Sequence, residues 1–340
     1  MKIIFIFGVK DSCIKTGGAK MEKKFAKPLS ALAAVLILAG IFSCKKNNSA
    51  SEKKLNIVAT VFPAYDWTRQ IAGDTADINI SLLMKNGVDL HSFSPTAQNI
   101  IQISECDILI YVGGESDRWI QDALKNKTNK NRTEINLMEI LGSSAKEEEV
   151  VEGMETDEGG DDEEEPEYDE HVWLSVKNAK LFCEKIESEL SRMLPEHSET
   201  FKANLLQYKT QLENLDKEFE DACKNIPNGT MIFCDRFPFR YFTEDYNLNY
   251  YAAFLGCSAE SEASFKTVAF LAEKIDELGA PEIFVLEKSD QKIAKTVMAN
   301  ATNKNVKIIA LDSLQSTDDG DIRNGKTYIS AMKNNLEKLR

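Results

Sequence analysis

Only three histidines occur in the 340-residue sequence, and two of them stand where a metal ion could be bound. His91 lies in Asp-Leu-His-Ser-Phe-Ser-Pro (89–95), directly after a strand-like segment, and His171 lies in Glu-His-Val-Trp-Leu-Ser (170–175). Imidazole is the commonest transition-metal ligand in proteins, and parallel-sheet proteins place ligand sites in loops at strand ends. The alternative is two unconnected polar loop residues, because eighty residues separate the pair.

The third histidine, His197, stands at the start of a long helix-like segment, between Glu196 and Glu199. A polar first turn of this kind is typical of a solvated helix end, so we expect His197 to lie outside any site.

Strand-like and helix-like segments alternate from Leu55 onward, which favours parallel sheets flanked by helices. Strands are expected at 55–62, 78–84, 108–114, 231–235, 249–254, 282–288 and 306–311. Helices are expected at 63–73, 96–106, 264–278 and 289–302.

Residues 196–225 differ from these short elements, because one apolar stripe recurs there at spacings of four and three. Such a helix would run about 45 Å, which is long for a connection inside one lobe. We therefore expect an N-terminal α/β lobe at 55–194, a linking helix at 195–226 and a C-terminal α/β lobe at 227–340.

The N-terminus has the features of a targeting signal. Residues 21–43 begin with lysines and contain an apolar run too short to span a membrane comfortably, as in a signal peptide. The run ends next to Cys44, which we expect to be lipidated and to start a polar tether at 44–54; an ordinary signal peptide with a chance cysteine is the alternative. Residues 1–20 precede the better start at Met21 and are excluded from the fold. The resulting protein would be anchored to a membrane and would not span it.

The acidity of the chain is concentrated in one segment. The formal net charge is -14, and residues 147–170 hold fifteen Asp or Glu with no Lys or Arg, so the remainder is close to neutral. The net negative charge argues against a nucleic-acid partner, which would need a basic face. We expect the low-complexity loop at 143–169 to be mobile, either as a solvated insert or as a collector of cations.

Seven cysteines are present, and five remain after Cys13 and Cys44 are set aside. The number is odd and no CxxC pair occurs, so neither a disulfide framework nor a cysteine zinc site is expected.

Several local strings together carry a family resemblance. They are IVATVFPAYDWTRQIAG (57–73), the His91 loop (89–95), ILIYVGGESDRWIQDAL (108–124) and the His171 loop (170–175). In combination, over roughly residues 55–340, they resemble the cluster A-I solute-binding proteins, which are the zinc- and manganese-binding receptors of bacterial ABC importers. The resemblance implies two α/β lobes joined by one long rigid helix, with the metal in the cleft between them.

The resemblance also implies four metal ligands, of which His91 and His171 are the first two. The third position falls on Arg236, whose guanidinium is always protonated and cannot bind a cation. Asp235 is the candidate in its place, or else an ion-pair partner of the neighbouring arginines. Asp312 matches the fourth ligand, with a helix or turn cap as the alternative. Glu262 and Glu287 are reserve carboxylates.

Two imidazoles and two carboxylates suit a borderline dication, with zinc favoured and manganese possible. Neutral imidazole is needed for binding, so affinity is expected to fall below about pH 6.

The resemblance thus implies a monomeric, lipid-anchored extracytoplasmic receptor that delivers the metal to the membrane permease of an ABC importer. Two alternative functions are considered: an exported metal-dependent hydrolase, and a surface adhesin on the same scaffold. No HExxH, GxSxG or Cys-His signature supports an enzyme, so we expect none.

Overall fold

The computed structural model describes residues 54–88, 90–125, 128–155, 167–258 and 262–340. The chain divides into two units, Met1–Ser51 and Glu52–Arg340, and every described residue belongs to the second unit. The expected signal peptide, the lipidation at Cys44 and the tether up to residue 53 lie outside the described residues. The described residues contain no helix whose length and hydropathy would allow it to span a bilayer.

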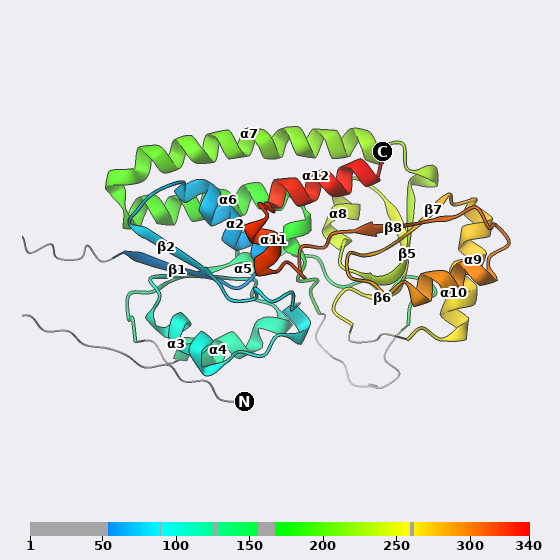
Figure 1. Cartoon of the computed structure of the whole chain (residues 1–340), viewed down its shortest axis with the longest axis horizontal. Helices are drawn as coiled ribbons and strands as arrows, with labels where there is room; N and C mark the ends of the chain where they lie inside the picture. The colour runs from blue at the N-terminus through cyan, green and yellow to red at the C-terminus, as the bar shows by residue number, and fades with distance from the viewer. Residues whose placement is uncertain (1–53, 89, 126–127, 156–166, 259–261) are drawn as a thin grey trace, which may run out of the picture. The chain divides into compact units, whose positions relative to one another are not determined.

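The first lobe is built on a four-stranded sheet of order β2-β1-β3-β4, in which all neighbours are parallel. Figure 1 shows β1 and β2 of this sheet side by side. Its strands are β1 (Leu55–Ala59), β2 (Ile78–Leu82), β3 (Ile108–Tyr111) and β4 (Thr133–Asn136). Its helices are α2 (Phe62–Ala72), α3 (Ala97–Glu105), α4 (Arg118–Lys125), α5 (Leu137–Leu141) and α6 (Val176–Met193).

Alternation along β1 gives this sheet two buried faces. Ile57 packs in the main core with Trp67 of α2 and Phe182 of α6. Val58 points to the opposite face, where it packs in a second cluster with Ile103 of α3. Successive strand residues point to opposite sides of a sheet, and a parallel sheet covered on both faces therefore needs a continuously apolar strand. This need explains the three consecutive apolar residues Ile57, Val58 and Ala59 of β1.

The second lobe contains a parallel sheet of order β6-β5-β7-β8. Its strands are β5 (Thr230–Phe237), β6 (Asn249–Leu255), β7 (Glu282–Leu286) and β8 (Lys307–Leu311). Its helices are α8 (Arg240–Asp245), α9 (Phe265–Leu278), α10 (Lys292–Asn300) and α11 (Asp319–Arg323). The parallel sheets and flanking helices confirm the expected fold class.

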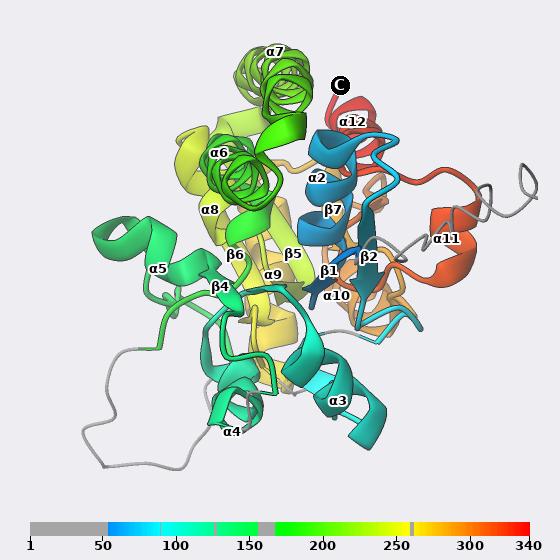
Figure 2. The ribbon, with the colours of Figure 1, turned by 90° about the vertical axis from the view of Figure 1, so that its left-hand side faces the viewer.

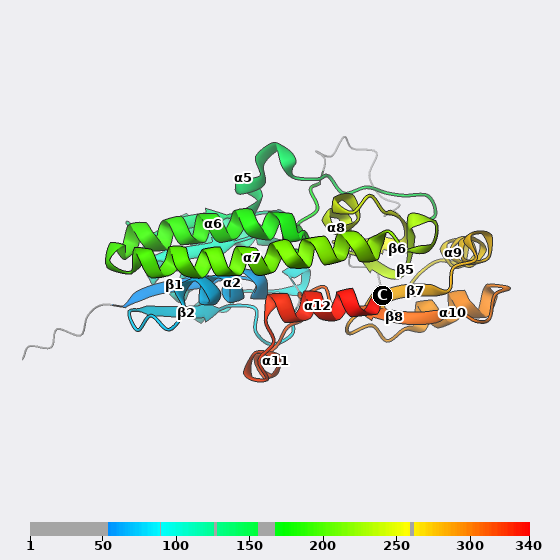
Figure 3. The same cartoon turned by 90° about the horizontal axis from the view of Figure 1, so that it is seen from above.

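The long helix α7 (Ser198–Cys223) has 26 residues, which corresponds to about 39 Å. Near its start, Asn204 Nδ2 donates a hydrogen bond to the carbonyl of Ile71 in α2 (2.9 Å). Near its end, Phe219 packs edge-on against Phe242 of α8. One helix thus contacts helices of both lobes, as expected, and Figures 1 and 3 show it running over both sheets beside α6.

The last helix, α12 (Tyr328–Lys338), also joins the two lobes. The backbone N–H of Tyr328 donates to the buried carboxylate of Asp66 in α2 (2.8 Å). Helix α12 also packs along α7, and Figure 2, which looks along α6 and α7, shows α2 between the first sheet and this layer of helices. The final helix therefore ties the second lobe back to the first.

Two leucines of α7 provide a matched test of this packing. Leu212 is completely buried, whereas Leu206 is 71% exposed. Leu212→Ala should lower the free energy of unfolding by about 2–5 kcal/mol, because it leaves a cavity in the core. Leu206→Ala should change it by less than about 0.5 kcal/mol. Urea unfolding of both variants checks the pair, and equal effects would contradict the assigned packing.

The acidic segment is more ordered than the sequence suggests, and the expectation that all of 143–169 is mobile is wrong. Its two ends pair antiparallel, with the N–H of Glu148 donating to the carbonyl of Glu167 (2.8 Å). Met154 is buried in the main core, and the N–H of Glu155 donates to the carbonyl of Ala253 in β6 (2.9 Å). Residues 143–155 and 167–169 thus form part of the folded molecule.

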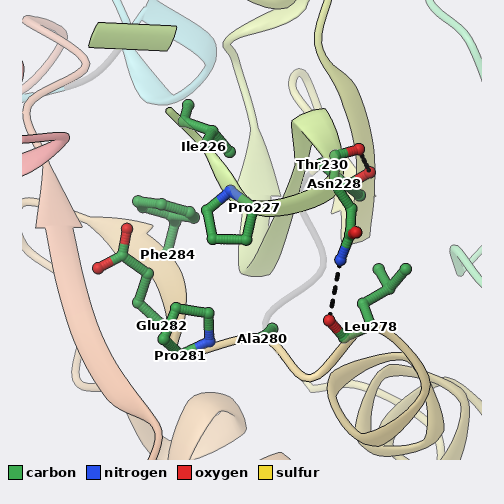
Figure 4. Close-up of a pocket in the computed structure, with 9 residues that line it drawn as sticks. All are labelled: Ile226, Pro227, Asn228, Thr230, Leu278, Ala280, Pro281, Glu282 and Phe284. Carbon is green, nitrogen blue, oxygen red and sulfur yellow. Dashed lines mark hydrogen bonds between the residues drawn. The ribbon is translucent and has the colours of Figure 1, made fainter. Parts of the chain in front are cut away.

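A small cavity of about 10 Å³ lies at the amino ends of β5 and β7 (Figure 4). Pro227 and Pro281 line it, and Asn228 Nδ2 donates to the carbonyl of Leu278 across one side (2.9 Å). The space suits about one water molecule. Among the described residues that line this cavity, Glu282 supplies the one carboxylate, and they offer no set of metal ligands.

Candidate metal centre

His91 lies in a short 3-10 turn, Leu90–Ser92, in the segment that follows β2. Its Nδ1 is 2.7 Å from the hydroxyl oxygen of Ser116, in the turn after β3. Ser116 is itself held, because its backbone N–H donates to Glu170 (2.7 Å). The segments that follow β2 and β3 thus orient the His91 ring through its Nδ1. Its Nε2 is not used in this contact.

His171 stands just before the 3-10 turn Val172–Leu174 and is completely buried. Asp169 accepts its backbone N–H (2.7 Å) and lies 3.0 Å from its Nδ1. Trp173, in the following turn, packs edge-on against the His171 ring, and its indole N–H donates to the carbonyl of Ser313 (2.9 Å). These contacts fix the ring from both sides.

The two Nε2 atoms of His91 and His171 face each other at 3.1 Å. Two imidazoles bound to one tetrahedral zinc ion at about 2.0–2.1 Å would bring their nitrogens to about 3.3 Å. When Asp169 accepts the Nδ1 proton of His171, the Nε2 lone pair is available to a metal, as in the carboxylate–histidine–zinc arrangement. The histidine pair therefore has the geometry of two ligands to one ion.

Negative charge surrounds this pair. Burial is the largest influence on His171 and lowers its pKa, but the carboxylates of Asp169, Glu170 and Glu148 together outweigh it, so the pKa of the imidazole lies above its ordinary value. Burial raises the pKa of Glu170 and of Glu148. An environment that stabilises positive charge on His171 favours a cation at this place.

The structure adds a residue that the sequence analysis missed. Among the described residues, His91, His171 and Cys257 form the group whose metal-ligating atoms all lie within 4.8 Å of one another. Cys257 follows the end of β6 and is half-buried. In the sequence it follows a strand-like segment, but no CxxC pair or other spacing marks it as a ligand.

Gly256 allows the Cys257 loop to approach the histidines. A Cβ at position 256 would lie 2.8 Å from the carbonyl oxygen of Phe237 and 3.0 Å from Cε1 of His171. Gly256→Ala should therefore lower the free energy of unfolding by about 1–3 kcal/mol through overpacking and weaken metal binding by displacing the loop. Calorimetric titration with zinc and urea unfolding measure both effects. Unchanged values in both would refute this close approach.

Asp235 and Asp312, the carboxylate ligands predicted from the sequence, do not belong to the histidine group found among the described residues, and their role as ligands stays a prediction. Both carboxylate oxygens of Asp235 accept backbone N–H groups, from Arg236 (2.9 Å) and Leu286 (3.2 Å). Asp312 forms an ion pair with Lys326 (2.6 Å) and caps the turn through the N–H of Leu314 (2.9 Å). These contacts hold both carboxylates in place, and a carboxylate that accepts hydrogen bonds can still bind a metal ion.

The two reserve carboxylates also lie outside the histidine group. Glu287 accepts hydrogen bonds from the N–H and hydroxyl of Ser313 (2.9 and 3.1 Å). Burial, and then the charge of Asp312, raises the pKa of Glu287. Glu287 and Asp235 line a cavity of about 110 Å³ at the carboxyl ends of β5 and β7. Glu262 is exposed.

The fold and the histidine pair define a two-lobed α/β protein with a candidate metal centre between the carboxyl ends of its sheets. The family model described as "ZnuA: Zinc-uptake complex component A periplasmic" matches residues 57–340. The chain belongs to this family, which confirms the resemblance drawn from the sequence.

Curated relatives agree with the family match. The chain is 30% identical to the zinc-binding lipoprotein AdcA of Streptococcus pneumoniae over 318 residues, covering 92% of this chain and 60% of the relative. It is 29% identical to the metal ABC transporter substrate-binding lipoprotein ScbA of Streptococcus cristatus, covering 90% of this chain and 95% of the relative. The chain thus spans less than two thirds of AdcA and nearly all of ScbA.

A solved structure supports the fold assignment. The Zn(II)-bound ZnuA-like domain of Streptococcus pneumoniae AdcA superposes with a TM-score of 0.65 at 29% identity, covering 84% of this chain and 97% of that domain.

Proposed function

We propose that this chain captures a divalent transition metal ion, with zinc favoured and manganese possible, and delivers it to the membrane permease of an ABC importer. The observation that carries the proposal is the opposed pair of Nε2 atoms, 3.1 Å apart, with each ring held at its Nδ1. Membership of a zinc-uptake family and the metal-binding names of its relatives support it.

His91 and His171 are the proposed ligands. Asp169 orients His171, and the three nearby carboxylates supply the negative charge that attracts the cation. Asp235 and Asp312 are the carboxylate candidates for further ligands, and their hydrogen bonds and ion pair fix the second-lobe loops.

The proposed cellular place is outside the cytoplasm, with Cys44 as the lipidated residue and the receptor as a monomer. The lipoprotein names of two relatives support the anchor. Capture and release of the ion, and not its use in catalysis, is the proposed role, because the chain belongs to a family of uptake components.

Elemental analysis combined with native mass spectrometry of the full chain tests this function. The expected result is one zinc ion per chain, retained through buffer exchange and absent from a His91→Ala/His171→Ala double variant. Equal metal content in both proteins would refute the proposed site, and no bound metal in the unaltered protein would refute the function.

A further inference from the structure

We infer that the thiolate of Cys257 is a third ligand of the metal ion, so that the centre has two nitrogens and one sulfur. The inference rests on the proposed function and deepens it. Its basis is that the sulfur and the ligating nitrogens of His91 and His171 lie within 4.8 Å of one another.

The distances fit coordination with a small adjustment. In a tetrahedral zinc site, a sulfur at about 2.3 Å and a nitrogen at about 2.0–2.1 Å from the ion are about 3.6 Å apart. The nitrogens are already near their bound separation, at 3.1 Å. The sulfur therefore needs to move by no more than about 1.2 Å, which a half-buried loop residue can do.

The backbone holds Cys257 at this position from two sides. On one side, Gly256 lies against the His171 ring, where a larger residue would not fit. On the other side, the N–H of Cys257 donates to the carboxylate of Glu148 (3.1 Å). Glu148 is in turn anchored by its own N–H to Glu167 (2.8 Å). The ordered ends of the acidic segment thus position the cysteine loop.

A sulfur ligand also accounts for an anomaly in the sequence. The ligand position after β5 that the resemblance implies is occupied by Arg236, which cannot bind a cation. Cys257 follows β6, which pairs directly with β5 in the second sheet. The second lobe therefore still supplies one ligand, but from the neighbouring strand.

The chemistry of binding is a simple exchange. The metal–sulfur bond forms as the S–H bond breaks, and the released proton passes to water, with no change in oxidation state. Thiolate is a soft ligand that selects zinc over manganese, whereas an all-nitrogen and oxygen set is less discriminating. The assignment therefore predicts a receptor with a stronger preference for zinc than the sequence alone indicates.

Cobalt substitution tests the assignment directly. The full chain, kept reduced with a non-thiol reductant, is titrated with Co²⁺ and its near-ultraviolet spectrum is recorded. We expect one equivalent of cobalt to produce a sulfur-to-metal charge-transfer band. Cys257→Ser should abolish the band and weaken cobalt binding by more than about tenfold. Cys223→Ala, which alters a cysteine at the end of α7, should retain both.

The outcomes separate the two proposals. Stoichiometric cobalt binding without the band, or a band that persists in Cys257→Ser, would overturn the assignment of Cys257 and leave the proposed function intact. Absence of any cobalt or zinc binding to the unaltered chain would overturn both. The spectrum of the unaltered chain is decisive even if Cys257→Ser folds poorly.

Discussion

His91→Ala should lower the affinity of the protein for zinc by at least about 100-fold, because loss of an orienting partner alone typically costs 10–100-fold and this change removes a ligand. The fold should be unaffected, since the His91 side chain is only partly buried. Competition against a zinc chelator gives the affinity, and circular dichroism gives the fold.

His197 offers a matched control for this variant. It directly precedes α7, and its Nε2 lies 3.1 Å from the carboxylate of Asp77. His197 does not belong to the group formed by His91, His171 and Cys257. His197→Ala should leave zinc affinity unchanged. Equal losses in the two variants would show that the effect comes from general destabilisation and not from a lost ligand.

Zinc affinity should also fall steeply with acidity, and the fall should begin above the pH at which an ordinary histidine would cause it. The pKa of His171 is raised, so its ring holds a proton up to a higher pH when no metal is bound. Zinc needs the neutral ring. Above the raised pKa, protons do not compete with zinc for the His171 ring. Below that pKa, protonation of this ring alone lowers the zinc affinity about tenfold per pH unit. This moves the onset above the value of about 6 that the sequence suggests.

Zinc affinities measured from pH 8 down to pH 5 check this expectation. Asp169→Asn removes the charge closest to His171 while keeping a hydrogen-bonding side chain there. The variant should bind zinc about 10–100-fold more weakly at pH 8, and its affinity should begin to fall at a lower pH than that of the unaltered protein. An unaltered protein that loses affinity only below pH 6 would contradict the electrostatic account.

The sequence was sufficient for the fold class, although not for every element, because the strongest signals are local. The apolar run of β1 and the stripe on α7 follow from burial on two faces of a sheet and on one face of a helix. The same stripe rule applies to α6, where Phe182, Ile186 and Leu190 recur at spacings of four, although this helix was not among the expected elements. Strand β4 was not expected because its sequence, Thr-Glu-Ile-Asn, contains a single apolar residue, Ile135.

The site was predictable only in part because its members come from distant segments. His91 and His171 could be selected by scarcity and context, and the structure brings them together. The hydrogen bonds of Asp235 could not be foreseen from sequence, because only the folded chain brings the backbone N–H groups of Arg236 and Leu286 to its carboxylate. Cys257 could not be selected, because its closeness to the histidines depends on how β6 and the His171 turn meet.

The most direct test of the central claim is anomalous diffraction at the zinc absorption edge from crystals of the zinc-loaded protein. We predict one strong peak about 2.0–2.1 Å from Nε2 of both His91 and His171. A peak at the carboxylates of Asp235 and Glu287, with none beside the histidines, would contradict the account.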